Sequence, residues 1–345
     1  MKLYRLGTVG WQDSQLLYHA LPRLDREGLI LLSPGSSYVC IGYFQAAEQE
    51  VELEFCQKKG IPVFRREVGG GAVYLDGGQL FYQLVIHRNN PLVPAGWEAF
   101  YRRFLQAPID AYRALGIPAA YRPVNDIVAN GRKVSGNGAA EIGDYLVLVG
   151  NLIVDFDYEM MARVLRVPGE KFRDKVFQTL QENLSTIRRE VGSAPGREVL
   201  WDLLVSKFAT ILGPLEAETT VDPTWRAGTD TLAEQMLGET WLHRREGLQP
   251  GRRVTIRAGV QVIHKMHKAP GGLIRATTEV QDGRISSVSL SGDFFFYPAE
   301  RLPDLEAALV GTRVGDSEKA IAGFCAEYGI SSPGVSPADL AQVVN

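Results

Sequence analysis

The sequence predicts an α+β protein of two domains. Its 345 residues correspond to about two domains at roughly 100–200 residues each. Amphipathic helical stretches are interspersed with β-prone runs over residues 1–245. The composition changes near 215–230 and again at 247–251. After the second change come shorter β-prone runs, followed by two predicted helices. We therefore predict a larger α+β domain over 1–245 and a small α+β domain over 250–345.

The N-terminal part mixes predicted helices with predicted strands. Helical spacing over 13–27 ends before Gly28, and Pro22 marks a kink or an earlier end. Apolar or β-prone runs bounded by Gly, Pro and polar residues predict strands. These strands cover 29–32, 37–43, 61–66 and 80–86, and further helices cover 50–59 and 96–115.

The middle of the chain predicts a β-hairpin over 126–136. Asn130-Gly131, the favoured two-residue hairpin turn, lies between its two β-prone halves. The elements predicted after it are a strand at 145–154, helices at 158–165 and 198–212, strands at 254–257, 273–280 and 285–291, and helices at 303–309 and 317–328.

Composition excludes several classes of protein. The formal net charge of -3 does not give the basic field of a general nucleic-acid binder. No apolar run approaches the ~20 residues that span a bilayer. The N-terminus lacks the apolar segment of a signal peptide, so we expect a cytoplasmic location. Cys40, Cys56 and Cys325 form no CxxC pair, which argues against both a zinc site and a disulfide framework.

The segment 65–74, Arg-Arg-Glu-Val-Gly-Gly-Gly-Ala-Val-Tyr, is a candidate anion site. Three glycines let the backbone approach a ligand, and their N–H groups can converge on an anion. The segment fits neither the P-loop nor the dinucleotide-binding fingerprint, and from the glycines alone a tight turn is an equal interpretation. Arg65 and Arg66 precede the glycines. Since adjacent side chains on a strand point to opposite faces, we predict Arg66 as the ligand-facing one.

The predicted hairpin supplies a second candidate element. Lys133 and Ser135 fall on one face of its returning strand, and Gly136 and Gly138 again allow close approach of a ligand. A lysine is a compact cation suited to a developing phosphoryl charge. A solvent-exposed lysine on a hairpin is the alternative, and these residues alone do not choose between the two.

Together the segments 64–74, 125–127 and 131–136 resemble the lipoate–protein ligase family, which belongs to a wider group with biotin–protein ligases and octanoyltransferases. The resemblance continues through 150–157, and the segments 270–275 and 285–295 resemble the accessory domain of the ligases. It implies a mixed-sheet catalytic domain of the biotin/lipoate ligase type and an ATP-dependent reaction in two steps. Lipoate becomes lipoyl-AMP, and the lipoyl group then passes to a lysine of a lipoyl carrier domain. Such carriers are 2-oxoacid dehydrogenase E2 domains, the glycine cleavage H-protein or related proteins.

The resemblance also implies roles for individual residues. Lys133 is the catalytic residue, in contact with both the α-phosphate and the lipoyl carbonyl. The ATP-binding residues are Arg66, Gly71, Ala72, Val73, Tyr74 and Lys133. The lipoate-binding residues are Gly70, Leu75, Lys133, Ser135, Gly136 and Val149. Mg²⁺ is expected with ATP, and Asp126 is its candidate ligand, with structural hydrogen bonding an equal alternative. The polar stretch 168–175 is a candidate cover that keeps water from the adenylate, or a solvated connection.

Three positions depart from the family pattern. Leu75-Asp76 stands where the family has His-Asp, Val149-Gly150 where it has His-Gly, and Gly78-Gln79 where it has Gly-Asn. Two histidines replaced by aliphatic residues indicate a more apolar acyl pocket. The acid could therefore be lipoate, octanoate or another medium-chain acid.

Two rival functions remain at this point. An acyltransferase that works through a cysteine thioester needs a thiolate beside a base or a cation. The three cysteines instead resemble small core residues, and none lies near Lys133 in the sequence. The second rival is a non-catalytic binder of carrier domains, against which the intact segment 66–74 and Lys133 argue. A biotin ligase is disfavoured because its Gly-Arg-Gly-Arg type of loop is absent.

Overall fold

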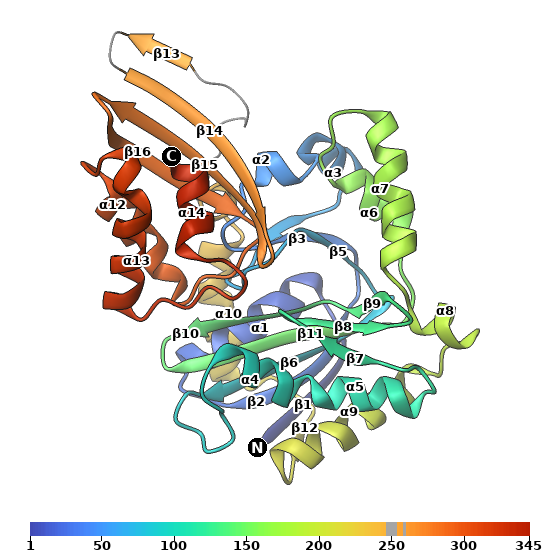
Figure 1. Cartoon of the computed structure of the whole chain (residues 1–345). Coiled ribbons are helices and arrows are strands. Elements are labelled where there is room, and N and C mark those ends of the chain that lie inside the picture. The colour runs from blue at the N-terminus through green and yellow to red at the C-terminus, as the bar shows by residue number, and fades with distance from the viewer. Residues whose placement is uncertain (246–253, 258–259) are drawn as a thin grey trace. The chain divides into compact units, whose positions relative to one another are not determined.

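The computed structural model describes residues 1–245, 254–257 and 260–345, so the predicted boundary segment at 247–251 lies outside the described residues. The predicted α+β class is confirmed (Figure 1). Within the described part of the chain, no helix is long and apolar enough to cross a lipid bilayer.

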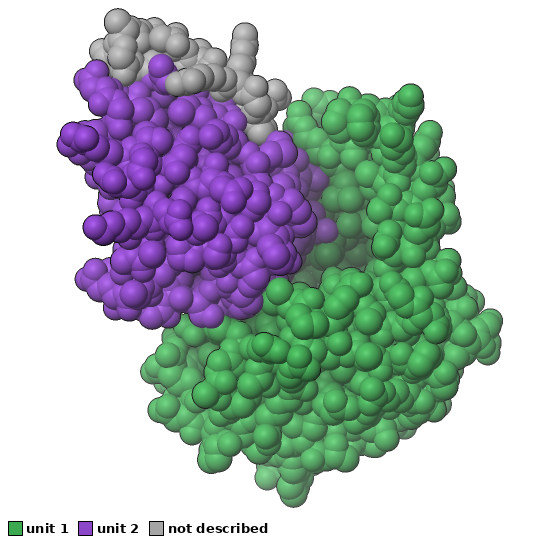
Figure 2. Space-filling model, in the orientation of Figure 1, with its two compact units in different colours: residues 1–40, 52–64, 73–238 green, residues 41–51, 65–72, 239–345 purple. Residues whose placement is uncertain are grey.

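The chain divides into two compact units that are not continuous in sequence (Figure 2). Unit 1 comprises residues 1–40, 52–64 and 73–238. Unit 2 comprises 41–51, 65–72 and 239–345. Two early segments thus group with the C-terminal part, whereas the sequence analysis placed both in the domain over 1–245. Their partners are distant in sequence, so a reading of local patterns does not detect the grouping.

Unit 1 is built on a mixed six-stranded sheet in the order β10-β11-β6-β2-β1-β12. The strand β1 pairs in parallel with β2 and β12, and the remaining neighbours pair antiparallel. Figure 1 shows α4, α5 and α9 over one face of this sheet and α1 and α10 over the other. The bounds are β1 Lys2–Val9, α1 Trp11–Arg23, β2 Gly28–Pro34, β6 Gln79–His87, α4 Trp97–Phe104, α5 Gln106–Ala114, β10 Asn137–Ile142, β11 Tyr145–Ile153, α9 Arg197–Leu212, β12 Glu216–Glu218 and α10 Pro223–Met236.

Two small sheets and four helices complete this part of the fold. One sheet has the order β4-β3-β5 and the other β7-β8-β9. Their strands are β3 Tyr38–Ile41, β4 Val63–Arg65, β5 Val73–Leu75, β7 Ala120–Arg122, β8 Asp126–Ala129 and β9 Arg132–Ser135. The helices are α3 Leu53–Lys59, α6 Tyr158–Val164, α7 Glu170–Asn183 and α8 Ile187–Val191.

Unit 2 contains an antiparallel sheet in the order β13-β14-β15-β16. Residues of β15 alternate between buried and half-buried, because one face packs on α12 and α14, which also meet α13. The bounds are α2 Ala47–Glu50, α11 Glu239–Leu242, β13 Val254–Arg257, β14 Val260–Ala269, β15 Gly272–Gln281, β16 Arg284–Gly292, α12 Leu302–Leu309, α13 Ser317–Tyr328 and α14 Pro337–Val344, with 3-10 turns at Ala299–Arg301 and Val314–Asp316.

Most predicted elements are present, and the differences have local causes. The helix predicted over 13–27 ends at Arg23, just after Pro22, and Asp25 takes a positive φ. The helix predicted over 96–115 is divided at Leu105 into α4 and α5. The strands β1 and β14 and the helices α7, α10 and α14 were not predicted, although Phe172, Val176 and Leu180 of α7 recur at helical spacing.

Candidate functional site

The predicted hairpin that carries Lys133 is present in unit 1. The strands β8 and β9 pair antiparallel. At the turn Asn130 has a φ of 49° and Gly131 a φ of 78°, the positive values that a two-residue hairpin turn of this kind requires. The hairpin prediction is therefore confirmed.

The ammonium group of Lys133 is held by a carboxylate. Lys133 Nζ lies 2.7 Å from Asp126 Oδ1, and Arg122 Nη2 lies 2.7 Å from Asp126 Oδ2. Burial is the largest single effect and disfavours ionisation of Asp126, but the charges and hydrogen bonds of Lys133 and Arg122 together outweigh it and lower the pKa of that carboxyl below its usual value. The Lys133 side chain keeps 34% of its surface exposed, so its cation is oriented by the pair and still open to a ligand.

The residues after Lys133 are fixed by β11. The Ser135 hydroxyl is buried and donates to the carbonyl of Asn151 at 2.6 Å. The backbone N–H of Gly136 donates to Asn151 Oδ1 at 2.9 Å. Ser135 thus has its hydroxyl engaged by the protein, while Gly136 is half-buried with no side chain to obstruct a ligand.

The Gly-rich segment lies in unit 2. Arg66 Nη2 donates to the carbonyls of Gly69, at 2.8 Å, and Gly71, at 2.9 Å, so this side chain closes the segment into a loop. A Cβ on Gly69 would lie 2.9 Å from the carbonyl oxygen of Phe294. At Gly71 the nearest atom to such a Cβ is 3.7 Å away. The first glycine is therefore required by protein packing, and the third leaves room for a ligand.

Gly42 supports this loop, although the sequence analysis did not select it. A Cβ on Gly42 would overlap the carbonyl oxygen of Gly70, which itself takes a φ of 89°. The available signal was a glycine near the end of the predicted strand at 37–43. A glycine at the end of a strand can mark a close approach of another backbone segment.

We expect Gly42→Ala to displace the Gly70 carbonyl and to cost about 1–3 kcal/mol of stability, as overpacking typically does. The KM for ATP in acid-dependent ATP–pyrophosphate exchange should rise by a larger factor than the KM for the acid. Gly196→Ala is the matched control, since a Cβ there meets nothing within 4 Å and its φ of -58° suits any residue. An unchanged KM for ATP in Gly42→Ala would contradict the placement of the nucleotide on this loop.

The remaining predicted residues lie on strands of unit 1. Val73, Tyr74 and Leu75 form β5, where Leu75 pairs with Tyr38. Val149 lies on β11 and is half-buried. Unit 1 therefore holds Lys133, Asp126, Ser135 and Gly136 on adjoining segments. Unit 2 holds Arg66, Gly70, Gly71 and Ala72.

The sequence analysis missed a set of buried polar side chains in unit 1. Their shared feature is a polar side chain inside a strand of otherwise apolar residues. Such residues need hydrogen-bond partners, and this is the signal that could have found them. The set consists of Gln79, Tyr82 and Asn151, and the half-buried Asn137 is hydrogen-bonded to Tyr82.

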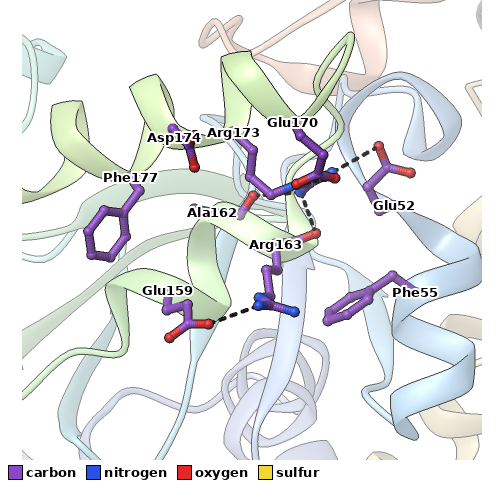
Figure 3. Close-up of a pocket in the computed structure, with 9 residues that line it drawn as sticks. All are labelled: Glu52, Phe55, Glu159, Ala162, Arg163, Glu170, Arg173, Asp174 and Phe177. Carbon is purple, nitrogen blue, oxygen red and sulfur yellow. Dashed lines mark hydrogen bonds and ion pairs between the residues drawn. The ribbon is translucent and has the colours of Figure 1, made fainter.

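The predicted covering stretch at 168–175 begins the helix α7, which has no buried residue. A cavity of about 480 Å³ lies between α3, α6 and α7, and Figure 3 shows Arg173 directed toward Glu52 and Glu170 beside it. Arg173 Nη1 also donates to the carbonyls of Ala162 and Arg163. It thereby caps the C-terminal end of α6 and ties α7 to it.

The three cysteines are poorly suited to nucleophilic catalysis. Cys40 and Cys56 are buried. Burial, with a smaller contribution from Glu52, raises the pKa of the Cys56 thiol to about 11, and burial raises the pKa of Cys325. A raised pKa keeps a thiol protonated at neutral pH, and the thiolate is the nucleophilic form.

The Asp126 carboxylate does not fit a resident magnesium ion, because each of its oxygens already forms an ion pair. Among the residues that the structure describes, no three His, Cys, Asp or Glu side chains are grouped to hold a metal. Mg²⁺ commonly binds through one or two carboxylates together with substrate phosphates.

Comparison with known proteins shows the family. The family described as lipoyl protein ligase A/B catalytic domain matches residues 10–209. The chain belongs to this family. The resemblance read from segments 64–74 and 131–136 is confirmed, and both segments lie within the matched region.

Relatives within the family include both ligases and octanoyltransferases. The chain is 35% identical over 159 residues to lipoate-protein ligase A subunit 1 of Thermoplasma acidophilum, and the match spans 43% of this chain and 59% of that subunit, less than two thirds of its length. It is 28% identical over 284 residues to a lipoate–protein ligase of Streptococcus pyogenes (79% of this chain, 77% of the relative). It is 26% identical over 227 residues to octanoyltransferase LipM of Kyrpidia tusciae (59% and 82%).

Solved structures of lipoate ligases share the fold. A lipoate-protein ligase A bound with ATP is 25% identical, with a TM-score of 0.59 over 70% of this chain and 98% of that one. LipL1 of P. falciparum in complex with lipoate is 16% identical, with a TM-score of 0.68 over 94% of both chains. At that identity the likeness concerns the fold, and it confirms the mixed-sheet lipoate ligase architecture with a small C-terminal domain.

Proposed function

We propose that this protein is an ATP-dependent lipoate–protein ligase. It activates lipoate, or a similar medium-chain acid, as an acyl-adenylate and transfers the acyl group to a lysine of a lipoyl carrier domain. The observation that carries the proposal is the partly exposed Lys133 ammonium, oriented by Asp126 at 2.7 Å within the region that matches the family. The likeness to a ligase bound with ATP supports the nucleotide.

In the first step a carboxylate oxygen of the acid attacks the α-phosphorus of ATP. The bond from this phosphorus to the bridging oxygen breaks, and pyrophosphate leaves with the electron pair. Two anions are joined and negative charge develops on the α-phosphate oxygens, so a preoriented cation lowers the barrier. Lys133 supplies that cation. The family resemblance further implies nucleotide contacts at Arg66 and at Gly71, Ala72, Val73 and Tyr74.

In the second step the uncharged amine of the carrier lysine attacks the acyl carbonyl carbon. The bond from this carbon to the phosphate oxygen breaks, AMP leaves, and the amine nitrogen gives up a proton to water. Charge now develops on the carbonyl oxygen, and Lys133 offsets it as well. One cation can serve both steps because the same acyl carbonyl is adjacent to the α-phosphate in the adenylate.

The deciding experiment is acid-dependent ATP–pyrophosphate exchange with lipoate, octanoate and biotin, in the presence of Mg²⁺. We expect exchange with lipoate or octanoate and none with biotin, followed by a mass increase of one acyl group on a lipoyl carrier domain. The absence of exchange with all three acids would falsify the ligase assignment. The aliphatic Leu75 and Val149 lead us to expect that octanoate competes effectively with lipoate.

A second candidate function is acyl transfer from a carrier thioester, as the similarity to octanoyltransferase LipM suggests. The thiols argue against a covalent route because Cys56 and Cys325 have raised pKa values and Cys40 is fully buried. We therefore expect a variant with Cys40→Ala, Cys56→Ala and Cys325→Ser to retain ATP-dependent exchange within a few-fold of the parent.

The control for the cysteine variant is its melting curve, which shows whether the two buried alanines disturb the core. Each single substitution should also be assayed. ATP-independent acylation of a carrier domain from an octanoyl thioester, lost in one folded single variant, would assign the protein to the acyltransferase class instead.

A further inference from the structure

Two buried amide side chains connect three strands of unit 1. Gln79 begins β6 and is 1% exposed, and Asn151 lies on β11 and is 7% exposed. Burying an amide costs free energy unless its donors and acceptors find partners. The partners that these two amides use are therefore informative about what the pair is for.

Their hydrogen bonds form a continuous chain. Asn151 Nδ2 donates to Gln79 Oε1 at 2.7 Å, and Gln79 Nε2 donates to the carbonyl of Tyr74 at 3.2 Å. At the other end the N–H of Gly136 donates to Asn151 Oδ1 at 2.9 Å. The chain thus runs from the backbone of β5 to the backbone that follows β9. Both ends are residues with proposed substrate contacts.

The Gly136 end lies beside the proposed catalytic group. A Cβ built on Gly136 would be 4.0 Å from Lys133 Cε and 3.8 Å from Asn151 Oδ1. Asn151 also accepts the Ser135 hydroxyl at its main-chain carbonyl. Asn151 therefore fixes the two consecutive residues Ser135 and Gly136, and the Lys133 side chain lies against this segment.

A second set of contacts anchors the hairpin from its other end. The Tyr82 hydroxyl donates to Asn137 Oδ1, and Asn137 Nδ2 donates to the carbonyl of Asn125 at 3.0 Å, just before Asp126. Gly150 makes this possible, since a Cβ there would overlap both the Tyr82 hydroxyl and Asn137 Oδ1. The hairpin is thus held independently of the Gln79–Asn151 pair, so loss of that pair need not unfold it.

We infer that Gln79 and Asn151 are positioning residues that couple the nucleotide side of the site, at Tyr74, to the acyl side, at Gly136 and Lys133. A shift of β5 on nucleotide binding passes through the two amides to the segment beside Lys133. The inference rests on the proposed function for the identity of the two substrates. Its consequence is reciprocal coupling, in which ATP strengthens lipoate binding and lipoate strengthens ATP binding by the same factor.

The test compares the wild-type chain with Gln79→Met, Asn151→Ala and the double variant. Lipoate binding is titrated by calorimetry with and without a non-hydrolysable ATP analogue and Mg²⁺. For the wild type we expect the analogue to raise the affinity for lipoate at least about fivefold. In each variant the analogue should leave the affinity for lipoate nearly unchanged. The double variant should lose no more coupling than either single one, because the pair acts as one unit.

The kinetic readout separates positioning from a purely structural role. In ATP–pyrophosphate exchange each single variant should lose about tenfold in kcat, the equivalent of one hydrogen bond, with smaller changes in both KM values. Gln83→Met is the matched control. Gln83 is buried on the same strand and donates to the carbonyl of Ser14 at 2.6 Å. It lies opposite Val149 but takes no part in the hydrogen-bond chain from Tyr74 to Gly136. Variants that melt earlier than the wild type but keep its coupling and kcat would overturn the inference.

Hydrogen exchange at the Gly136 amide tests the geometry without any activity. The amide should be protected in the wild type and exchange faster in Asn151→Ala than in Gln83→Met. Equal exchange in the two variants rejects the positioning role even if the protein is a ligase. If the wild type shows no ATP–pyrophosphate exchange, the proposed function fails, and this measurement still decides whether Asn151 holds Gly136.

Discussion

Replacement of Lys133 by alanine is expected to lower acid-dependent ATP–pyrophosphate exchange by about 10²–10³-fold, the loss typical for a group that offsets charge in a transition state. The fold should be retained. Lys133 is 34% exposed and pairs with a single carboxylate, and a partly exposed ion pair contributes little to stability. The loss should fall mainly on kcat, because the charge that Lys133 offsets is largest in the transition state.

The matched control is Lys58→Ala. Lys58 also forms an ion pair, with Glu54 at 3.6 Å, and is 77% exposed, but it lies outside the proposed site. Asp126→Asn provides a graded comparison, since it keeps the lysine cation and removes the carboxylate that orients it. We expect a smaller loss of kcat there than in Lys133→Ala. Exchange at the wild-type rate in Lys133→Ala would remove this residue from the mechanism.

The hairpin that carries Lys133 was predictable because its determinants are local. Asn130-Gly131 defines the turn, and the β-prone residues on either side define the strands. The orienting carboxylate was also within reach of sequence reasoning, which selected Asp126 but could not decide between a metal ligand and a structural partner. That decision depends on the direction of a side chain toward Lys133 and Arg122, which a strand pattern alone does not give.

The Gly-rich segment shows what local patterns cannot give. Strand alternation predicted Arg66 as the ligand-facing member of the pair, and that role stays a prediction, while Arg65 is fully buried and Arg66 closes the loop. It could not show that the segment belongs to unit 2, or that Gly69 is a glycine because Phe294 lies against it. These contacts join residues more than two hundred positions apart. They follow from the packing of the whole unit rather than from any window of sequence.

Arg65 is the residue whose loss should most damage unit 2. It has no exposed surface, and its guanidinium donates to the carbonyls of Gly42, Tyr43, Gln45, Trp241 and Leu242. Burial, and then the charges of Arg244 and Arg245, lower the pKa of Arg65 to about 9, so it still carries its charge at neutral pH. One side chain therefore ties together three separate segments of the unit.

We expect Arg65→Met to lower the free energy of unfolding by more than about 4 kcal/mol, which is exceptional for one substitution. Methionine fills a similar volume but leaves five carbonyls without this donor, three of them on the buried residues Gly42, Tyr43 and Gln45, and an unsatisfied buried group costs about 1–3 kcal/mol. Arg65→Lys should recover part of the loss, because its ammonium can serve three of these acceptors. Arg66→Ala should instead change the free energy of unfolding only slightly and raise the KM for ATP strongly.

The measurement is denaturant unfolding combined with hydrogen exchange of peptides covering 41–51, 65–72 and 239–242. Peptide resolution is needed because a chain with two compact units need not unfold in a single step. Faster exchange should appear first in these three segments of Arg65→Met, and the six-stranded sheet of unit 1 should stay protected. If Arg65→Met and Arg66→Ala had equal unfolding midpoints, the hydrogen bonds from Arg65 to the five carbonyls would not be what holds the unit together.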